Sequence, residues 1–282
     1  MERITKIVAF HHAAKVHFMV GNQRRVLVTG GGTFLGDNIT AALLGEGAEV
    51  TLLVRPGLED RLGALGQRVR WWTADIWDVA SLRGRARGHG VVIHTVGSMT
   101  EDHSQGLTHH RLNFVSARNA ATMCISDGVP QMVLMSSAAA PWISRSYVRS
   151  KREAEEYLQR VGVKSAVIRA PLAYIRGQPR PAFYELMTLL GSVPPTSWLG
   201  VGKIAPMPID VLARGVARIA LEPQRTNSIY TAADLRRRNQ RHELAKPLMV
   251  GEAPGEKPRV HPFDLLDDEA PFGWVPPSDK RR

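Results

Sequence analysis

A cluster of glycines between two apolar segments constrains this chain more than any other feature. An apolar run at 25–28 is typical of a strand, and the sequence TGGGTFLG follows it at 29–36. Apolar residues recur at helical spacing from 35 to 43, and a second strand-like run lies at 50–54. Strand, glycine turn, helix and strand within about 30 residues form the βαβ unit that binds a dinucleotide pyrophosphate at a helix N-terminus. Glycines are needed there because a Cβ would keep the backbone away from the phosphates.

Strand-like and helix-like segments continue to alternate up to residue 170. Apolar runs lie at 69–72, 90–94, 131–135 and 166–169, with helix-like segments between them at 79–82, 113–124 and 147–161. The run at 90–94 is apolar throughout, which is typical of a strand buried on both faces of a parallel sheet. Strands that alternate with helices in this way predict an α/β fold with a doubly wound parallel sheet.

Changes in composition suggest where the domains begin and end. Residues 24–176 are predicted to form the dinucleotide-binding domain. Prolines then become frequent, and residues 177–235 are predicted to form a small C-terminal lobe packed on that domain, over the reactive end of the cofactor. Apolar patterns within this lobe predict helices at 183–190 and 209–221 and a late strand at 228–230.

The two ends of the chain differ from the middle. Residues 1–23 are a basic N-terminal extension without the apolar core and cleavage site of a secretory signal. This extension is either a short amphipathic helix or simply upstream sequence. Residues 236–282 are rich in proline and charge, so we expect a mostly extended or disordered tail.

Charge and cysteine content exclude several classes of protein. The single Cys124 excludes a disulfide framework, and the histidine pairs at 11–12 and 109–110 lack further ligands at metal spacing, so no metal is expected. No apolar run reaches the roughly 18 residues of a membrane span, and a cytoplasmic protein is expected. The net charge of +11 fits a solvated arginine-rich surface, an anionic cofactor, an acidic partner or peripheral contact with the inner face of an energy-transducing membrane. Nucleic acid is not expected, because no nucleic-acid-binding motif is present.

The residue after the second predicted strand is expected to decide between NAD and NADP. An acid at this place accepts a hydrogen bond from the ribose 2′-hydroxyl and favours NAD, whereas an arginine binds a 2′-phosphate and favours NADP. Arg55 occupies this place, and the next acids are Glu59 and Asp60. We therefore expect NADP or NADPH, with NAD as the alternative.

A tyrosine and a lysine at helical spacing form the candidate catalytic set with a serine. Tyr147 and Lys151 lie four residues apart at the start of a predicted helix, which places them on one face. A lysine ammonium near a phenol lowers its pKa, so Tyr147 is able to act as general acid or base. Ser137 ends the preceding strand, where its hydroxyl is expected to orient a substrate oxygen. These residues are a catalytic candidate because of their position, at the carboxyl end of a strand of a dinucleotide-binding sheet.

These motifs together resemble the short-chain dehydrogenase/reductase superfamily, in its extended or atypical branch. The resemblance rests on VLVTGGGTFLG at 26–36, TADI at 73–76, HTVG at 94–97, Asn113, YVRSK at 147–151 and RAP at 169–171. It implies a Rossmann-type fold and a role for Asn113 in a water relay. The implied cofactor-binding residues are Gly30, Gly32, Thr33, Phe34, Leu35, Gly36, Arg55, Asp75, Ile76, Val96, Gly97, Lys151, Pro171 and Leu172. By this resemblance Asp75 and Ile76 would flank the adenine, Val96 and Gly97 would line the cofactor, and Pro171 and Leu172 would neighbour the nicotinamide carboxamide.

One position departs from the family pattern TGxxGxxG. Thr33 stands where the family has its middle glycine, and Gly32 comes one place earlier, as if the two residues had been exchanged. The Thr33 hydroxyl is able to hydrogen-bond a phosphate, whereas its Cβ would move the pyrophosphate outward.

Two functions remain open at this point. The favoured one is an NADP-dependent oxidoreductase or epimerase that acts on a hydroxyl or carbonyl compound. The run YVRSKREAE at 147–155, however, most resembles the atypical group that contains the nucleotide-binding accessory subunit of respiratory complex I. That resemblance implies the alternative, a non-catalytic NADP(H)-binding accessory or assembly subunit whose basic surface docks on a membrane complex.

Overall fold

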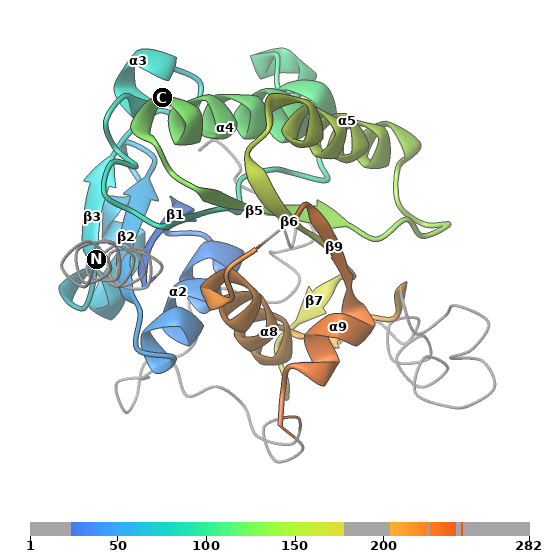
Figure 1. Ribbon diagram of the computed structural model, residues 1–282. Helices are drawn as coiled ribbons and strands as arrows, with labels where there is room; N and C mark the ends of the chain where they lie inside the picture. Colours follow the sequence, from blue (N-terminus) through green and yellow to red (C-terminus); the bar gives the residue numbers. More distant parts are fainter. Residues whose placement is uncertain (1–23, 178–203, 225, 241–243, 245–282) are drawn as a thin grey trace, which may run out of the picture.

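The computed structural model describes residues 24–177, 204–224, 226–240 and 244, and its centre is a seven-stranded parallel sheet. The strand order is β3-β2-β1-β4-β5-β6-β9, so the chain runs from β1 to one edge, returns to the centre and continues to the other edge (Figure 1). This is the doubly wound α/β fold that the sequence predicted. The strands are β1 (Arg25–Gly31), β2 (Glu49–Val54), β3 (Arg70–Thr73), β4 (Val91–His94), β5 (Gln131–Ser137), β6 (Lys164–Ala170) and β9 (Ser228–Thr231).

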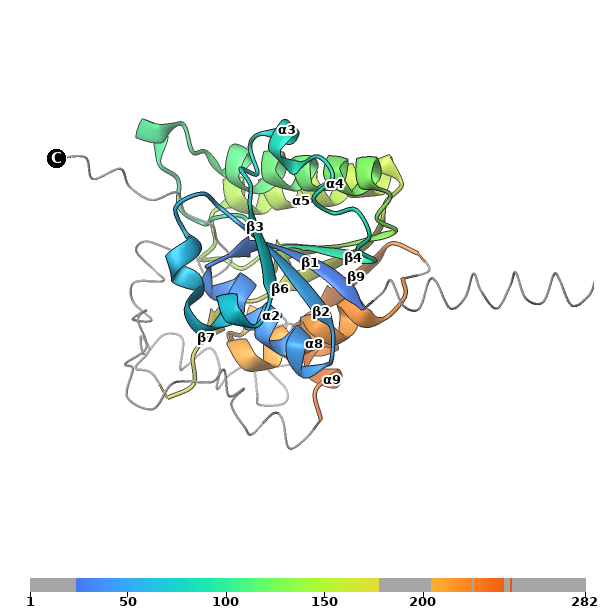
Figure 2. The ribbon, with the colours of Figure 1, turned by 90° about the vertical axis from the view of Figure 1, so that its left-hand side faces the viewer.

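Helices cover both faces of this sheet. One face carries α4 and α5 side by side, and the other carries α2 and α8, with α9 packed against α8 (Figures 1 and 2). A short helix, α3, follows β3. The helices are α2 (Phe34–Gly45), α3 (Val79–Leu82), α4 (Ser116–Asp127), α5 (Arg145–Val161), α8 (Ile209–Leu221) and α9 (Ala232–Arg237).

The core lies between the sheet and these two helical layers. All residues of β4 and β5 are buried, as expected for central parallel strands covered on both faces. α5 turns Tyr147, Ala154 and Leu158 toward the sheet and keeps Glu156 and Arg160 in solvent. Each large apolar side chain buried in this way contributes roughly 1.5–3 kcal/mol.

Several short elements were not predicted. One turn of π-helix, η3 (His110–Val115), precedes α4, so the helix expected from Asn113 begins earlier. The 3-10 segments η1 (Glu59–Gln67) and η2 (His103–Gln105) and the two-stranded sheet of β7 (Ala173–Tyr174) and β8 (Met207–Pro208) are also new. The segments η2, β7 and β8 have only two or three residues and cannot display a hydrophobic period, and η1 is interrupted by non-helical backbone at Gly63.

The segment predicted as a small lobe contributes directly to the main sheet. β9 pairs in parallel with β6, and α8 packs beside α2 on the sheet face. Ordered structure also continues past the predicted tail boundary at 236, because Asn239 is buried and donates hydrogen bonds to the main-chain oxygens of Val211 and Leu235. The helix predicted at 183–190, the extension 1–23 and most of the predicted tail lie outside the described residues.

None of the helices that the structure describes is long and apolar enough to cross a membrane.

The carboxyl ends of the central strands are the part of the fold that matters for function. In a doubly wound sheet ligands bind at this edge, where the strand order reverses on either side of β1. The loops after β1, β4, β5 and β6 all leave the sheet here.

Candidate functional site

The glycine loop forms a cradle between the end of β1 and the start of α2. Gly30 and Gly32 have φ values of 81° and 79°, in the left-handed region that glycine adopts without strain. A Cβ on Gly36 would collide with the carbonyl oxygen of Gly30, so only glycine lets the helix approach the loop this closely. Phe34 and Leu35 supply first-turn N–H groups, which have no acceptor within the helix. This cradle, at the positive end of a 12-residue helix, fits the pyrophosphate of a dinucleotide.

Thr33 caps this helix with its hydroxyl turned into the protein. The hydroxyl donates to the carbonyl oxygen of Gly30 (2.6 Å) and accepts from the N–H of Gly36 (3.2 Å), and the residue is only 4% exposed. Its backbone is extended, with φ of −114°, while the left-handed conformation falls on Gly32. The exchange of glycine and threonine therefore creates no backbone strain, and the Thr33 hydroxyl acts on the loop itself.

Asp37 occupies one N–H donor of the loop. Its Oδ1 accepts a hydrogen bond from the N–H of Gly32 (2.9 Å). A carboxylate in the first turn of α2 is also favoured by the positive end of the helix. A phosphate that bound the Gly32 N–H would have to replace this carboxylate.

Arg55 and Asp75, both predicted at the adenosine end, are neighbours in the structure. Arg55 directly follows β2, and burial lowers the pKa of its guanidinium while the Asp75 carboxylate opposes that shift. Asp75 lies in a tight turn after β3, where it accepts a hydrogen bond from the N–H of Trp77 (2.9 Å). The two charges therefore stand together at the ends of adjacent strands, where a ribose 2′-phosphate would lie in a fold of this kind.

The predicted walls of the cofactor site, Ile76, Val96 and Gly97, are buried. Asn119 of α4 donates a hydrogen bond to the carbonyl oxygen of Ile76 (2.9 Å), which fixes the loop after β3. A Cβ on Gly97 would lie 2.6 Å from Nζ of Lys151 and closer still to Oδ1 of Asn113. Glycine at this position therefore leaves room for both polar side chains beside the loop after β4.

Lys151 is fully buried at the centre of the site. Its Nζ donates a hydrogen bond to the carbonyl oxygen of Met135 (3.0 Å) and lies 5.8 Å from the ring centroid of Tyr147. Burial lowers the pKa of Lys151 to about 7, although the Glu155 carboxylate opposes this shift. An amine with this pKa changes its protonation near neutral pH.

Tyr147 is also fully buried, and its hydroxyl has no hydrogen-bond partner among the described residues. Burial raises the pKa of the phenol, while the Arg152 guanidinium and the Ser137 hydroxyl, which is near the phenol but outside hydrogen-bond geometry, oppose the shift. Ser137 ends β5 and donates its own hydroxyl hydrogen to the carbonyl oxygen of Ala138 (3.0 Å). The structure thus brings Ser137, Tyr147 and Lys151 together, as the sequence predicted. A buried hydroxyl without a partner costs about 1–3 kcal/mol, which a bound polar ligand would recover.

Asn113 is engaged by the main chain on both sides of its amide. Its Oδ1 accepts from the N–H of Ser98 (3.1 Å), and its Nδ2 donates to the carbonyl oxygens of Ser98 (2.8 Å) and His109 (3.0 Å). Both amide hydrogens are used, so none remains for the predicted water relay. In this structure Asn113 instead fastens the loop after β4 to η3.

Pro171 and Leu172 follow β6 and are buried where the nicotinamide carboxamide was expected. The N–H of Met207 donates to the carbonyl oxygen of Leu172 (2.9 Å), which joins this corner to β8. The part of the chain that the structure describes contains no cluster of three or more histidine, cysteine or acidic side chains suited to a metal ion.

Some residues of the site were missed from the sequence. Glu155 is buried behind Lys151, where it accepts hydrogen bonds from Ser136 (2.5 Å), from Arg169 (2.6 Å) and from Arg152. Its position four residues after Lys151 on the same helix face could have indicated it. His94 hydrogen-bonds Thr29 (3.0 Å) and Ser116 (3.2 Å), partners that no local pattern predicts.

Comparison with known proteins identifies the family to which the chain belongs. Residues 30–178, more than half of the chain, match the NAD(P)H-binding family. An uncharacterized chloroplastic protein of Arabidopsis thaliana is 31% identical over 159 residues, which are 53% of this chain and 51% of that protein. The chain therefore spans about half the length of this curated relative.

Two solved structures show the same fold at low sequence identity. A UDP-glucose 4-epimerase of Thermus thermophilus, solved with NAD, is 20% identical with a TM-score of 0.53, over 76% of this chain and 81% of that one. A dTDP-glucose 4,6-dehydratase of Streptomyces venezuelae, also solved with NAD, is 20% identical with a TM-score of 0.52, over 73% and 74% of the two chains. The family match places the chain in the NAD(P)H-binding family, and its seven-stranded sheet has the Rossmann-type fold of these epimerase and dehydratase structures.

Proposed function

We propose that this protein is an NADP-dependent oxidoreductase or epimerase that acts on a hydroxyl or carbonyl group. The nicotinamide of the bound cofactor would exchange a hydride with the substrate carbon. Tyr147 would exchange a proton with the substrate oxygen, Lys151 would stabilise the tyrosinate, and Ser137 would orient that oxygen. Asn113 would keep the loop after β4 in place around the cofactor.

The observation that carries this proposal is the buried, unpartnered hydroxyl of Tyr147 between Lys151 and Ser137. A phenol that only filled the core would be expected to pair its hydroxyl, because buried polar groups are almost always hydrogen-bonded. The protonated Lys151 side chain would favour tyrosinate and so bring its pKa toward neutrality when the site is filled. The position at the carboxyl ends of β4, β5 and β6 is where such a fold holds the reactive part of its ligand.

Arg55 supports the choice of NADP over NAD. A guanidinium at the end of β2 is able to bind a 2′-phosphate by charge-assisted hydrogen bonds. The nearby Asp75 would orient it, and Asp75 is itself held by the N–H of Trp77. The alternative cofactor, NAD, would leave this arginine without a phosphate to bind.

A turnover assay with NADPH tests the enzyme proposal. Carbonyl compounds, nucleotide sugars and quinones form the substrate panel, and Tyr147→Phe is expected to abolish hydride transfer while NADPH still binds. Tyr157→Phe is the matched control, because Tyr157 lies on the same helix but packs against Phe114, with ring centroids 6.0 Å apart. Turnover that survives in Tyr147→Phe would reject the assigned role of Tyr147, and no turnover with any compound would reject the enzyme.

The second candidate is the non-catalytic NADP(H)-binding accessory or assembly subunit of a membrane respiratory complex. It is favoured by the net charge of +11, which suits an acidic partner or an anionic membrane face. Bound NADP(H) would then stabilise the fold by mass action. Native mass spectrometry that finds retained nucleotide, together with co-purification with membranes and no turnover, would support this candidate over the enzyme.

A further inference from the structure

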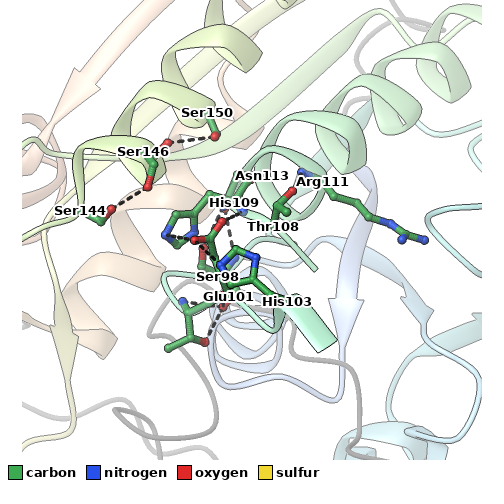
Figure 3. A network of polar contacts seen from close by, with 11 residues as sticks. Ser98, Glu101, His103, Thr108, His109, Arg111, Asn113, Ser144, Ser146 and Ser150 are labelled. Carbon is green, nitrogen blue, oxygen red and sulfur yellow. Dashed lines mark hydrogen bonds and ion pairs between the residues drawn. The ribbon is translucent and has the colours of Figure 1, made fainter. Parts of the chain in front are cut away.

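A second group of titratable side chains, Glu101, His103 and His109, lies on the segment between β4 and η3 (Figure 3). Glu101 accepts a hydrogen bond from the N–H of His109 (2.6 Å), and its Oε2 lies 3.8 Å from Nε2 of His109 and 3.5 Å from Nε2 of His103. The imidazole of His109 packs edge-on against the ring of Tyr147, with centroids 5.7 Å apart. One carboxylate therefore orients both the backbone and the ring of a histidine that touches the candidate catalytic tyrosine.

Two buried polar atoms in this contact have no hydrogen-bond partner within the described part of the chain. They are the hydroxyl of Tyr147 and the Nδ1 of His109. His94 is the contrast, because it is also buried but hydrogen-bonds through both ring nitrogens. Because buried polar groups are almost always hydrogen-bonded, each of these two atoms calls for a polar group from a ligand or a water. The contact between the two rings would allow one such group to serve both atoms.

The cluster also leads from the buried site to solvent. Exposure of the side chain rises from 6% at His109 to 26% at Glu101 and 75% at His103. The Tyr147 site needs such a path, because a fully buried phenol has to exchange its proton with solvent once in each reaction. The side chain of Asn113 offers no free amide hydrogen to such a path, since both are bound to main-chain oxygens.

We propose that Glu101 and His109 form a second acid–base pair in the Tyr147 site, and that His103 connects this pair to solvent. The proposal rests on the oxidoreductase function proposed above. When Tyr147 gives its proton to the substrate oxygen, protonated His109 returns a proton to the tyrosinate through the shared polar group. His109 is then reprotonated from solvent by way of His103 and Glu101. One proton moves from solvent to the substrate oxygen, and the reverse reaction moves one proton out.

The electrostatic surroundings of His109 are compatible with this role. Burial lowers the pKa of His109, while the Glu101 carboxylate raises it and His103 lowers it further. The carbonyl oxygen of Ser98 also raises this pKa, although its contact with the ring falls short of hydrogen-bond geometry. Two residues of α5 also belong to these surroundings. Tyr147, which is neutral, contacts the His109 ring, and the amine of Lys151 lies near Gly97 and Asn113. The Glu101 carboxylate is thus the only negatively charged group among those that shift the pKa of His109.

Histidine NMR on the NADPH-saturated protein tests the pair without any substrate. His109, assigned from His109→Gln, is expected to titrate reversibly below pH 7, whereas His94 stays neutral because burial lowers its pKa to about 3. Glu101→Gln keeps an acceptor for the His109 N–H but removes the charge, so it is expected to lower the His109 midpoint by about one pH unit. Glu153→Gln is the matched control, since Glu153 lies 3.8 Å from the exposed ring of His110. Tyr147→Phe is expected to move the His109 midpoint, because the lost hydroxyl shares its polar group.

The outcomes separate this pair from the function on which it rests. A His109 signal that is independent of pH, like that of His94, or a midpoint that Glu101→Gln or Tyr147→Phe leaves unchanged would overturn the pair. Where the panel contains a substrate, His109→Gln is expected to lower kcat by roughly 100-fold and added imidazole to restore His109→Ala, with His110→Gln unaffected. A linked, titrating His109 without any turnover would reject the oxidoreductase alone.

Discussion

Arg152 donates a hydrogen bond from Nη2 to the main-chain carbonyl oxygen of Ser137 (2.9 Å). The residue that follows Lys151 therefore holds the end of the strand that carries Ser137. The same guanidinium donates to the hydroxyl of Ser136 (3.1 Å) and pairs with Glu155, which in turn binds Arg169 of β6. This buried cluster joins α5 to the ends of β5 and β6, and so it sets the position of Ser137 relative to Tyr147.

The first prediction concerns the carboxylate at the centre of this cluster. Glu155→Gln keeps the shape of the side chain but leaves two guanidinium groups without their shared anion, so we expect a loss of about 3 kcal/mol in the free energy of unfolding. Urea denaturation followed by circular dichroism measures it. Glu153→Gln on the same helix is the control, because Glu153 is 40% exposed and its pairs with Arg149 and His110 are long; we expect a change below about 0.5 kcal/mol. If Glu155→Gln lowered the free energy of unfolding as little as Glu153→Gln does, the cluster would add no stability.

The second prediction separates two glycines of α2. Gly36→Ala places a methyl group against the carbonyl oxygen of Gly30, so the loop must open and NADPH binding is expected to be lost. Gly45→Ala, at the other end of the helix, meets nothing within 4 Å and is expected to stabilise the protein by about 0.5–1 kcal/mol. Fluorescence titration with NADPH and thermal unfolding measure both effects. NADPH affinity that is unchanged in Gly36→Ala would reject the cradle as the pyrophosphate site.

Much of this fold was predictable from local sequence. The apolar runs of β4 and β5, the glycine turn before α2 and the amphipathic pattern of α5 each carry their information in neighbouring residues. The parallel topology then follows from the alternation of strands and helices. The grouping of Ser137, Tyr147 and Lys151 was predictable for the same reason, since a strand end and a following helix start meet at one edge of the sheet.

What could not be predicted depends on contacts between distant segments. The sequence shows that Thr33 replaces a glycine, but only the folded loop shows its hydroxyl capping Gly36. From the sequence, Asn113 was a candidate for a water relay. In the folded protein its amide is hydrogen-bonded to the main chain of Ser98. In the sequence His109 was one half of an ordinary histidine pair. Its contacts with Glu101 and Tyr147 depend on its place at the start of the π-helix η3, and a π-helix has no recognisable sequence period.

The third prediction tests the choice of cofactor. Arg55→Ala removes the guanidinium proposed to bind the 2′-phosphate, so the dissociation constant for NADPH is expected to rise about tenfold or more, as for one lost hydrogen bond between charged groups. The dissociation constant for NADH is expected to change little. Isothermal titration calorimetry with both nucleotides measures the difference, with the exposed Arg149→Ala as a control for net charge. If the two nucleotides were weakened equally, Arg55 would not be the selectivity residue.

The fourth prediction uses the pKa of Lys151 in the cofactor-free protein. The amine titrates near 10.5 when unfolded and at about 7 when buried, so between these values the unfolded chain binds more protons than the folded one. The free energy of unfolding should therefore rise with pH in this window, by about 1.4 kcal/mol per pH unit from this group. Lys151→Met lacks the amine, and its unfolding free energy, measured in urea between about pH 7 and pH 9, is expected to rise less steeply than that of the wild type. Parallel slopes in the two proteins would mean that Lys151 keeps its proton when buried, held by the carboxylate of Glu155.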